Sequence, residues 1–378
     1  MKALSGPTLA ERLTLAGNRP SGFDYLRLVL STLVLASHTI NVCYGRQFTL
    51  DVWAGPARPF LAVILPMFFA LSGFLVAGSV ERCRTLVSFA GLRVLRIVPA
   101  LAVETVLSAL IIGTVFTDLP LQAYFADARF FSYFENIIGH IHYVLPGVFD
   151  GNPWGNSVNN QLWTLPYELM CYTVLTGLLF LGVAQRPRLF VPFLFLCNIG
   201  LLVAAVRKGI GPAAMVSGPI LVQCFLFGVA AFLYRARIVW SHGLGALALV
   251  LTLACLGAPL GDYLAPLPAT YLTVYLGLMH PHRIKVLFGG DYSYGIFLYG
   301  FPIQQAVVAA IGPHEWYLNL LIAYPITLTL AVFSWRVVEK PALQWKSRLL
   351  DLESRVIGLA QRMPGGRILC PPIGIPRR

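Results

Sequence analysis

The chain has 378 residues, of which 57% are hydrophobic and only 12% are charged. Soluble domains carry about 25% charged residues, so this composition, with a mean hydropathy of +0.72, excludes an ordinary soluble protein and predicts one polytopic membrane domain. The formal net charge of +12 does not indicate nucleic-acid binding, because the basic residues follow the membrane topology described below.

Apolar stretches of about 20 residues, the length at which a helix crosses a bilayer, recur along the whole sequence. We therefore predict an all-α fold with about ten transmembrane helices. Their approximate ranges are 23–43, 60–80, 94–116, 162–183, 189–206, 215–233, 240–258, 264–280, 292–311 and 316–335. The eighth is short and contains Pro266 and Pro268, which leaves nine or eleven helices as alternatives. The one long connection covers 117–161, and its segment HIHYVLPGVF suits a re-entrant or interfacial position.

Basic residues distinguish the two sides of the predicted bundle. Most lie at the two termini and in alternate connections, whereas the opposite side holds only Arg46, Arg58, Arg129, Arg207 and Lys208. Because Lys and Arg accumulate in cytoplasmic loops, both termini are predicted to be cytosolic.

The C-terminal segment differs in composition from the rest of the chain. Residues 347–363 have the amphipathic helical period of a helix that lies on a membrane surface. The Pro- and Gly-rich residues that follow are predicted to be a flexible tail. We therefore divide the chain into a transmembrane domain, 1–346, and a cytosolic segment, 347–378.

The first predicted span carries a line of polar side chains. At about 100° per residue, Asp24, Arg27, Ser31 and His38 fall on one helix face. Ionisable groups at membrane depth are costly and usually face a protein interior or a water-filled path, although a lone histidine is often only a structural hydrogen-bond donor. Arg27 and His38 lie about 16 Å apart along the axis, so they can contact two ends of one elongated ligand but not each other.

The second and third spans contribute further candidates. Arg93 and Arg96 lie one turn apart and project to the same side of a helix as Glu104. Guanidinium groups suit phosphate binding, and simple positive-inside anchoring is the alternative. Ser72 belongs to FFALSGF, where small residues more often permit close helix packing than take part in catalysis.

The fourth span begins with NNQLWTLPYELMCY and includes Glu168. This carboxylate is expected about 7–8 Å below the outer surface, at the depth expected for His38. Two titratable groups at one level on separate helices can form a base and its orienting partner; a carboxylate held by helix–helix hydrogen bonds is the alternative. Asn160, Trp163 and Tyr167 are candidate ligand contacts in the same segment.

The long connection contains His140 and His142 at i, i+2. Metal binding would require further ligands that the sequence does not indicate, so no metal site is predicted. The sequence also lacks a GxSxG elbow, a Walker loop and an HExxH motif.

Six motifs in a fixed order resemble the membrane acyltransferase 3 family, whose members O-acylate bacterial surface glycans and related carbohydrates. They are FDYLR followed by His38, FFALSGFLVAGS, the RVLR pair, LPGVF…NP…NNQLWTLPYE, DYSYGIFLYGFPI at 291–303 and VEKPAL at 338–343. The resemblance covers nearly the whole chain. One departure is NNQLW where many relatives have NGSLW, and we expect it to affect the acceptor side.

The resemblance implies ten transmembrane helices with cytosolic termini in the bacterial cytoplasmic membrane. It also implies an acyl-CoA donor, generally acetyl-CoA, and a sugar hydroxyl as acceptor. The key arginine and histidine of the family correspond to Arg27 and His38, and its RxxR pair corresponds to Arg93 and Arg96.

These observations together predict an enzyme in which acyl-CoA enters from the cytosol. Its phosphates would bind Arg93, Arg96 and Arg27, and its pantetheine arm would follow the first helix to His38. His38 would act as general base with Glu168 orienting it, and direct acylation of His38 is a variant.

Asp24 and Ser72 are further candidate substrate contacts in this scheme. A proton-coupled transporter or flippase and a sensor without chemistry are the alternative functions. The acyl length, the glycan and the oligomeric state stay open.

Overall fold

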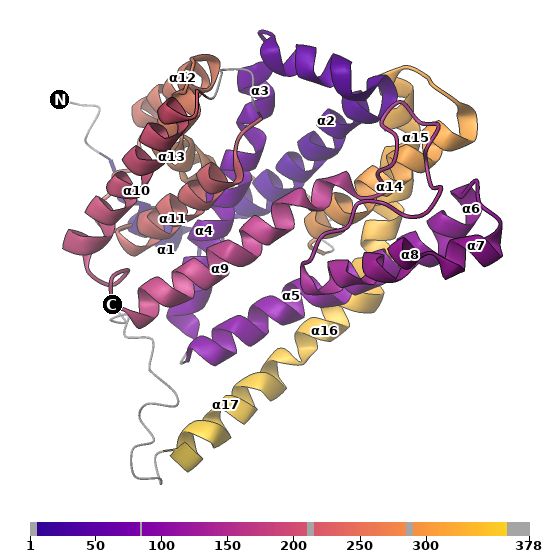
Figure 1. Ribbon diagram of the computed structural model, residues 1–378. Coiled ribbons are helices and arrows are strands. Elements are labelled where there is room, and N and C mark those ends of the chain that lie inside the picture. The colour runs from indigo at the N-terminus through magenta and orange to yellow at the C-terminus, as the bar shows by residue number, and fades with distance from the viewer. Residues whose placement is uncertain (1–5, 84, 210–214, 285–289, 361–378) are drawn as a thin grey trace.

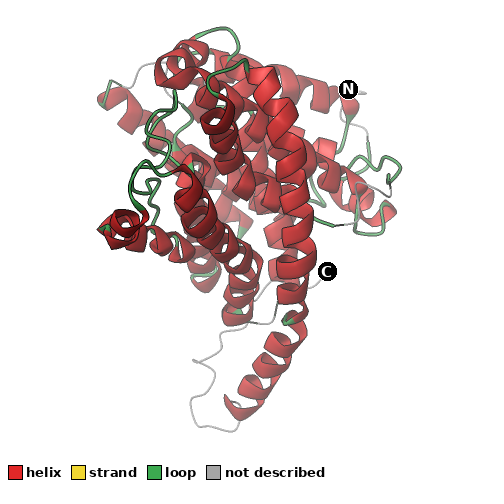
Figure 2. Ribbon diagram, turned by 90° about the vertical axis from the view of Figure 1, so that its right-hand side faces the viewer, coloured by secondary structure: helices red, strands yellow, loops and turns green. Residues whose placement is uncertain are grey.

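The computed structural model describes residues 6–83, 85–209, 215–284 and 290–360. These residues form a helical bundle without a β-strand (Figures 1 and 2). Within the described chain six helices are long and apolar enough to cross a membrane, and two further apolar helices are shorter. The all-α, multi-span fold is therefore confirmed, whereas the predicted count of about ten is not.

The helices fall into three groups along the chain. The first group is α1 (Leu9–Leu15), α2 (Ser21–Ala54), α3 (Arg58–Ala62), α4 (Ile64–Arg82), α5 (Leu86–Leu107) and α6 (Gly113–Phe116). The long connection then contains α7 (Leu121–Ala126), α8 (Ala128–Ser132) and two 3-10 helices, Tyr133–Ile138 and Asn160–Thr164. The last group is α9 (Leu165–Phe180), α10 (Pro187–Arg207), α11 (Gly218–Leu233), α12 (His242–Gly257), α13 (Pro266–Gly277), α14 (Ser293–Ile311), α15 (Trp316–Ser334), α16 (Lys340–Gln344) and α17 (Lys346–Ala360).

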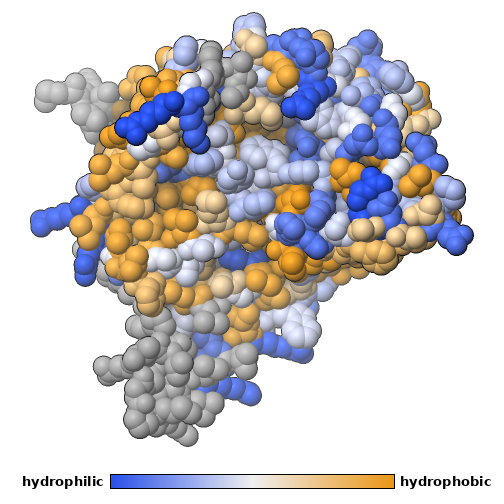
Figure 3. Space-filling view, in the orientation of Figure 1, coloured by the Kyte–Doolittle hydropathy of each residue, from blue (hydrophilic) through white to orange (hydrophobic). Residues whose placement is uncertain are grey.

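The surface of the bundle is apolar over broad areas. Leu196 on α10 is 68% exposed and Leu321 on α15 is 71% exposed. On the face shown in Figure 3, apolar residues gather at the left and below the centre, and hydrophilic residues are denser along the upper and right margins. Large exposed apolar areas of this kind mark a surface that contacts other apolar matter, which for a chain of this composition is lipid.

Helices α4 and α11 form the centre of the bundle. Gly73 on α4 lies against the backbone carbonyl of Phe225, and Gly228 on α11 lies against that of Ala70. Small residues let membrane helices approach this closely. The FFALSGF motif therefore contributes helix packing, as predicted, and it fixes the position of Ser72 beside the contact.

Helix α2 continues beyond the predicted span to Ala54 but is kinked at Gly45. Gly45 has φ of 77°, a region that favours glycine, and the carbonyl of Pro153 lies against it. The regular part of α2 thus stops at Tyr44, near the boundary expected from hydropathy. The opposite end of α2 contacts the segment after α13, where the backbone N–H of Gly22 donates to Met279 O at 3.0 Å.

The C-terminal helices form an arm that leaves the bundle (Figures 1 and 2). Helix α17 confirms a helix in the predicted amphipathic segment and is tied to the start of α5, where the hydroxyl of Thr85 donates to Glu353 at 2.5 Å. Its position on a membrane surface stays a prediction, as does the domain boundary at residue 346. The predicted tail lies outside the described residues.

Candidate functional site

A cavity of about 340 Å³ lies between α2, α4, α5, α9, α14 and the C-terminal arm. This volume is within the range of small-molecule sites. Four cationic side chains line it: Arg27, Arg93, Arg96 and Lys346. Most of the remaining wall is apolar, and Ser72, Glu168 and Tyr172 add polar groups. We call it the arginine cavity.

Asp291 organises two of these arginines. Its Oδ2 accepts from Arg27 Nη1 at 2.7 Å and from Arg96 Nη2 at 2.6 Å, and Ser293 donates to its Oδ1 at 2.6 Å. Burial alone would raise the pKa of Asp291, but the two guanidinium groups outweigh that effect and hold its pKa well below the usual value. Asp291 is therefore an ionised anchor at the start of α14.

Arg96 and Arg93 have different hydrogen-bond and ion-pair partners, although the sequence predicted that they act as a pair. Arg96 also donates to Glu339 at 2.9 Å, so two carboxylates hold it. Arg93 donates to Ser79 Oγ at 3.2 Å and forms no ion pair with any described residue. Its buried Nε has no hydrogen-bond partner in the described chain. Arg93 therefore keeps donors for an anion in the cavity, whereas the donors of Arg96 are largely occupied.

Replacing Asp291 with asparagine is expected to destabilise the protein by about 2–3 kcal/mol, because two guanidinium groups would lose their shared counter-charge in a mostly buried place. The side chains of Arg27 and Asp291 are 28% and 23% exposed, so solvent screens part of the loss. The melting temperature of the purified variant in detergent measures it. The matched control is Asp127→Asn, which removes an exposed local pair and is expected to leave the melting temperature nearly unchanged; equal shifts would contradict the anchoring role.

A second, smaller cavity of about 40 Å³ contains His38. The half-buried imidazole packs edge-to-face on Phe301 with ring centroids 5.3 Å apart, and its Nδ1 lies 3.5 Å from Asn41 Nδ2. Two tryptophans, Trp53 and Trp163, also line the cavity, and its other polar lining groups are Ser37, Asn41, Thr49, Gln161 and Thr164. We call it the histidine cavity.

The two cavities adjoin each other. Val34, Leu65, Thr164 and Phe297 line both. Arg27 and His38 thus belong to neighbouring chambers along one helix, as the sequence analysis suggested when it assigned them to two ends of one ligand. The cationic chamber and the chamber that contains the histidine therefore share part of their walls.

Glu168 and His38 are not brought together. The hydroxyl of Tyr172 donates to Glu168 at 2.5 Å, and Glu168 lines the arginine cavity, whereas His38 lines the histidine cavity. No hydrogen bond joins the two among the described residues. The reason is local: the 3-10 helix Asn160–Thr164 precedes α9 and itself reaches the histidine cavity, so Glu168 lies one turn further into the bundle.

The remaining predicted residues divide between site and scaffold. Ser72 lines the arginine cavity and Trp163 the histidine cavity, and Tyr167 packs edge-to-face on Trp163 with centroids 6.0 Å apart. Asn160 lines neither of these two cavities. Asp24 also lies outside both and accepts from Arg283 at 3.3 Å at the start of α2.

Residues of the NNQLW motif contribute both to the scaffold and to the histidine cavity, a difference that the sequence did not show. Its first residue, Asn159, is buried and donates to Glu104 at 2.5 Å, so Glu104 supports the scaffold and not the arginine cavity. Its third residue, Gln161, lines the histidine cavity and donates to Leu298 O at 2.8 Å. One of the two departures from NGSLW therefore lies in the wall of that cavity.

Several lining residues escaped the sequence analysis. Asn41 and Thr49 are ordinary polar residues of one helix and its bent end, and Lys346 begins α17 far along the chain. Asp291 and Glu339 belong to the motifs DYSYGIFLYGFPI and VEKPAL, which marked their segments without showing that both contact Arg96. Recognising that contact requires the packing of α5 against α14 and against the π-helix Trp335–Glu339, which follows α15.

The comparisons with known proteins extend over nearly the whole chain. A family model described as an acyltransferase domain matches residues 21–336, which include every residue that lines the two cavities except Leu343 and Lys346. An "O-acetyl transferase" of Shigella phage Sf6 is 25% identical over 349 residues, covering 88% of this chain and 98% of that protein. "Nodulation protein 10" of Rhizobium leguminosarum bv. viciae is 28% identical over 363 residues, covering 89% and 96%. No solved structure matches the chain significantly.

Proposed function

The chain belongs to the acyltransferase family whose domain model covers residues 21–336, and from this premise we propose that it is a membrane O-acetyltransferase. It takes the acetyl group from cytosolic acetyl-CoA and transfers it to a hydroxyl of a surface carbohydrate, in the cytoplasmic membrane of a bacterium. The observation that carries the proposal is the pair of adjoining cavities, one lined with cations and one containing His38. The printed name of the Shigella phage relative supports O-acetyl transfer in particular.

The arginine cavity binds the donor in this proposal. Hydrogen bonds from charged donors to phosphates are stronger than those from neutral donors, and Arg93, which lines the cavity, has an Nε without a partner among the described residues. Lys346 lines the same cavity and is exposed, so it can meet the phosphates at the cytosolic mouth. Arg27 and Arg96 stay on Asp291 and contribute mainly positive potential.

The pantetheine arm then extends along α2 toward the histidine cavity. Arg27 and His38 are separated by eleven residues of helix, about 16 Å, and apolar residues such as Val34 and Phe297 line the boundary between the chambers. An extended, mostly uncharged arm suits such a passage. The thioester is delivered beside Thr164, within reach of His38.

His38 acts as general base in the histidine cavity. It takes the proton of the acceptor hydroxyl while the hydroxyl oxygen forms a bond to the thioester carbon. The carbon–sulfur bond then breaks, and the leaving CoA sulfur receives the proton from the imidazolium. One histidine thus completes the proton cycle. Glu168 lines the donor cavity, where Tyr172 binds it, and takes no part in the proton transfer.

Asn41 and Thr49 orient the imidazole. The Thr49 hydroxyl has one proton and two acceptors in reach, Gly45 O at 2.8 Å and Asn41 Oδ1 at 3.1 Å. In the structure Asn41 Oδ1 accepts from Thr49, and Asn41 Nδ2 faces His38 Nδ1 at 3.5 Å. The proposal exchanges the two atoms of this amide, so that Thr49 donates to Gly45 O, Asn41 Nδ2 donates to Thr49 and Asn41 Oδ1 accepts from His38 Nδ1. This arrangement keeps the proton on Nδ1 and leaves Nε2 as the base.

The acceptor approaches from the side opposite the arginines. Trp53 and Trp163 line the histidine cavity, and tryptophan presents a large flat apolar surface with one polar N–H. A sugar ring suits such a wall, because one of its faces carries C–H groups and its edge carries hydroxyls. Gln161 adds a polar group beside them.

The direct test uses purified protein in lipid nanodiscs with acetyl-CoA radiolabelled in the acetyl group. The label is expected to appear on surface glycan, and acetyl-CoA labelled in its adenine is expected to give none. Mass spectrometry of glycans from cells with and without the protein identifies the acceptor. Movement of glycan across vesicle membranes without transfer of label would instead indicate a transporter.

A further inference from the structure

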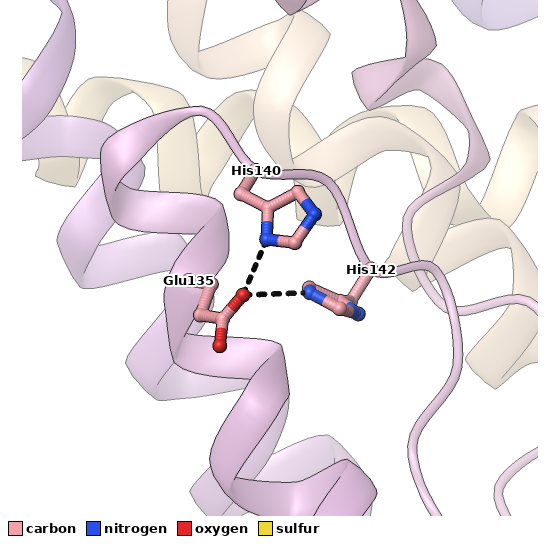
Figure 4. A group of neighbouring side chains, drawn as sticks. All are labelled: Glu135, His140 and His142. Carbon is pink, nitrogen blue, oxygen red and sulfur yellow. Dashed lines mark hydrogen bonds and ion pairs between the residues drawn. The ribbon is translucent and has the colours of Figure 1, made fainter.

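Three metal-ligand side chains converge in the long connection between α6 and α9. Glu135 Oε2 contacts His140 Nδ1, and it lies 3.0 Å from His142 Nε2 (Figure 4). One potential ligand atom from each residue lies within 4.8 Å of the other two. From the sequence alone no metal was predicted here, because only two potential ligands, the histidines, lie close together in the chain. Folding supplies Glu135 as the third ligand.

The backbone holds the three residues in this arrangement. Glu135 lies in the 3-10 helix Tyr133–Ile138, and Gly139 turns the chain back with φ of 86°, a left-handed conformation that favours glycine. Buried Asn136 then accepts from the His142 N–H at 2.7 Å and donates to the His142 carbonyl at 3.0 Å. The turn therefore fixes the backbone of both i, i+2 histidines on the side of Glu135.

We propose that Glu135, His140 and His142 bind a divalent transition-metal ion, most favourably Zn²⁺. Two imidazoles and one carboxylate form a common zinc ligand set. The hard cations Ca²⁺ and Mg²⁺ prefer six or more oxygen ligands, which this cluster does not offer. Copper and nickel also suit imidazole, so the class is transition metals and Zn²⁺ is its representative.

Only small side-chain movements are needed for binding. Ligands about 2.0–2.2 Å from zinc in a tetrahedral site lie roughly 3.3–3.5 Å from one another, compared with the 4.8 Å limit in the present arrangement. His140 is 70% exposed and Glu135 is 44% exposed, so both can rotate toward a shared centre. His142 is less exposed, at 30%, and provides the fixed point.

A bound ion would stabilise the segment that leads to Gln161 in the wall of the histidine cavity. It would fasten the 3-10 helix to the segment that contains Tyr143, whose carbonyl accepts from the Val158 N–H at 2.7 Å. Val158 immediately precedes Asn159, the residue that binds Glu104. The metal site is thus a structural brace for the segment before Gln161 and does not depend on the reaction proposed above.

The test is zinc titration by calorimetry on the full-length protein, purified without a polyhistidine tag and treated with a chelator. One site per chain is expected, and E135Q and H142A are each expected to weaken binding about tenfold or more, because each removes one of three ligands. Co²⁺ absorption reports the coordination number independently. The melting temperature is expected to rise with zinc in the parent and not in E135Q. A melting transition of E135Q at the temperature of the metal-free parent shows that the variant is folded and has lost only the ion.

The matched control is H282A, because His280 and His282 have the same i, i+2 spacing in the segment after α13 and belong to no described cluster of three potential ligands. This variant is expected to bind zinc like the parent. Absence of binding by the parent protein would overturn the proposal. Binding that E135Q and H142A leave unchanged would also overturn it, and so would loss of binding in H282A alone.

Discussion

Replacing His38 with alanine is expected to lower kcat for acetyl transfer about 10²–10⁴-fold, the usual contribution of a positioned general base. The affinity for acetyl-CoA is expected to stay unchanged, because His38 lines the histidine cavity and none of the cationic groups does. Initial rates with labelled acetyl-CoA and direct binding of CoA to the same preparation separate the two quantities. The H38Q variant is expected to resemble H38A, since glutamine fills similar space but takes up no proton.

The matched control is Ser37→Ala. Ser37 lines the same cavity, and its hydroxyl is already bonded to Val34 O at 2.7 Å within the helix, so its loss is expected to change kcat less than about threefold. Incubation with labelled acetyl-CoA in the absence of acceptor tests the covalent variant, which predicts label on His38. Full activity of H38A would refute both roles for the imidazole.

Replacing Arg93 with glutamine is expected to raise KM for acetyl-CoA about 10–100-fold, with a smaller change in kcat. The physical reason is the loss of a charge-assisted hydrogen bond, worth roughly 1.5–3 kcal/mol. Arg93 is expected to matter for donor binding because it has no carboxylate partner among the described residues, whereas Asp291 and Glu339 hold Arg96. In R96Q the melting temperature is therefore expected to fall, and KM to change less than in R93Q.

Two controls sharpen this comparison. Arg188 is an exposed arginine at the start of α10 that lies outside the arginine cavity, so R188Q removes one charge without touching the site and is expected to leave KM unchanged. R93K keeps the charge but loses the planar fork, and we expect it to recover only part of the affinity. Equal KM changes in R93Q and R188Q would mean that only net charge matters and would exclude Arg93 as a phosphate ligand.

The motifs identified most of the segments that build the site but not the partners within them. Each of three motifs contributes lining residues: Arg27 from FDYLR, Arg93 and Arg96 from RVLR, and Gln161 and Trp163 from NNQLW. The pairing of Glu168 with His38 was inferred from calculated depth, and depth does not determine direction around a helix axis. A carboxylate can therefore lie at a suitable level and still bond Tyr172 on its own helix.

The sequence by itself determined that this is a multi-span membrane protein with a helical fold. It also determined that Arg27 and His38 lie far apart on one face of α2. Apolar length and helical period determine these features, and both depend only on residues close in the chain. The length of individual helices was less certain, since several shorten or bend where they pack. Tertiary structure alone decided that Asp291 joins Arg27 to Arg96, that the cationic and histidine chambers adjoin, and that Glu135 meets two histidines. The reason is that each of these contacts depends on how folded segments pack, and helical period and apolar length do not encode that packing.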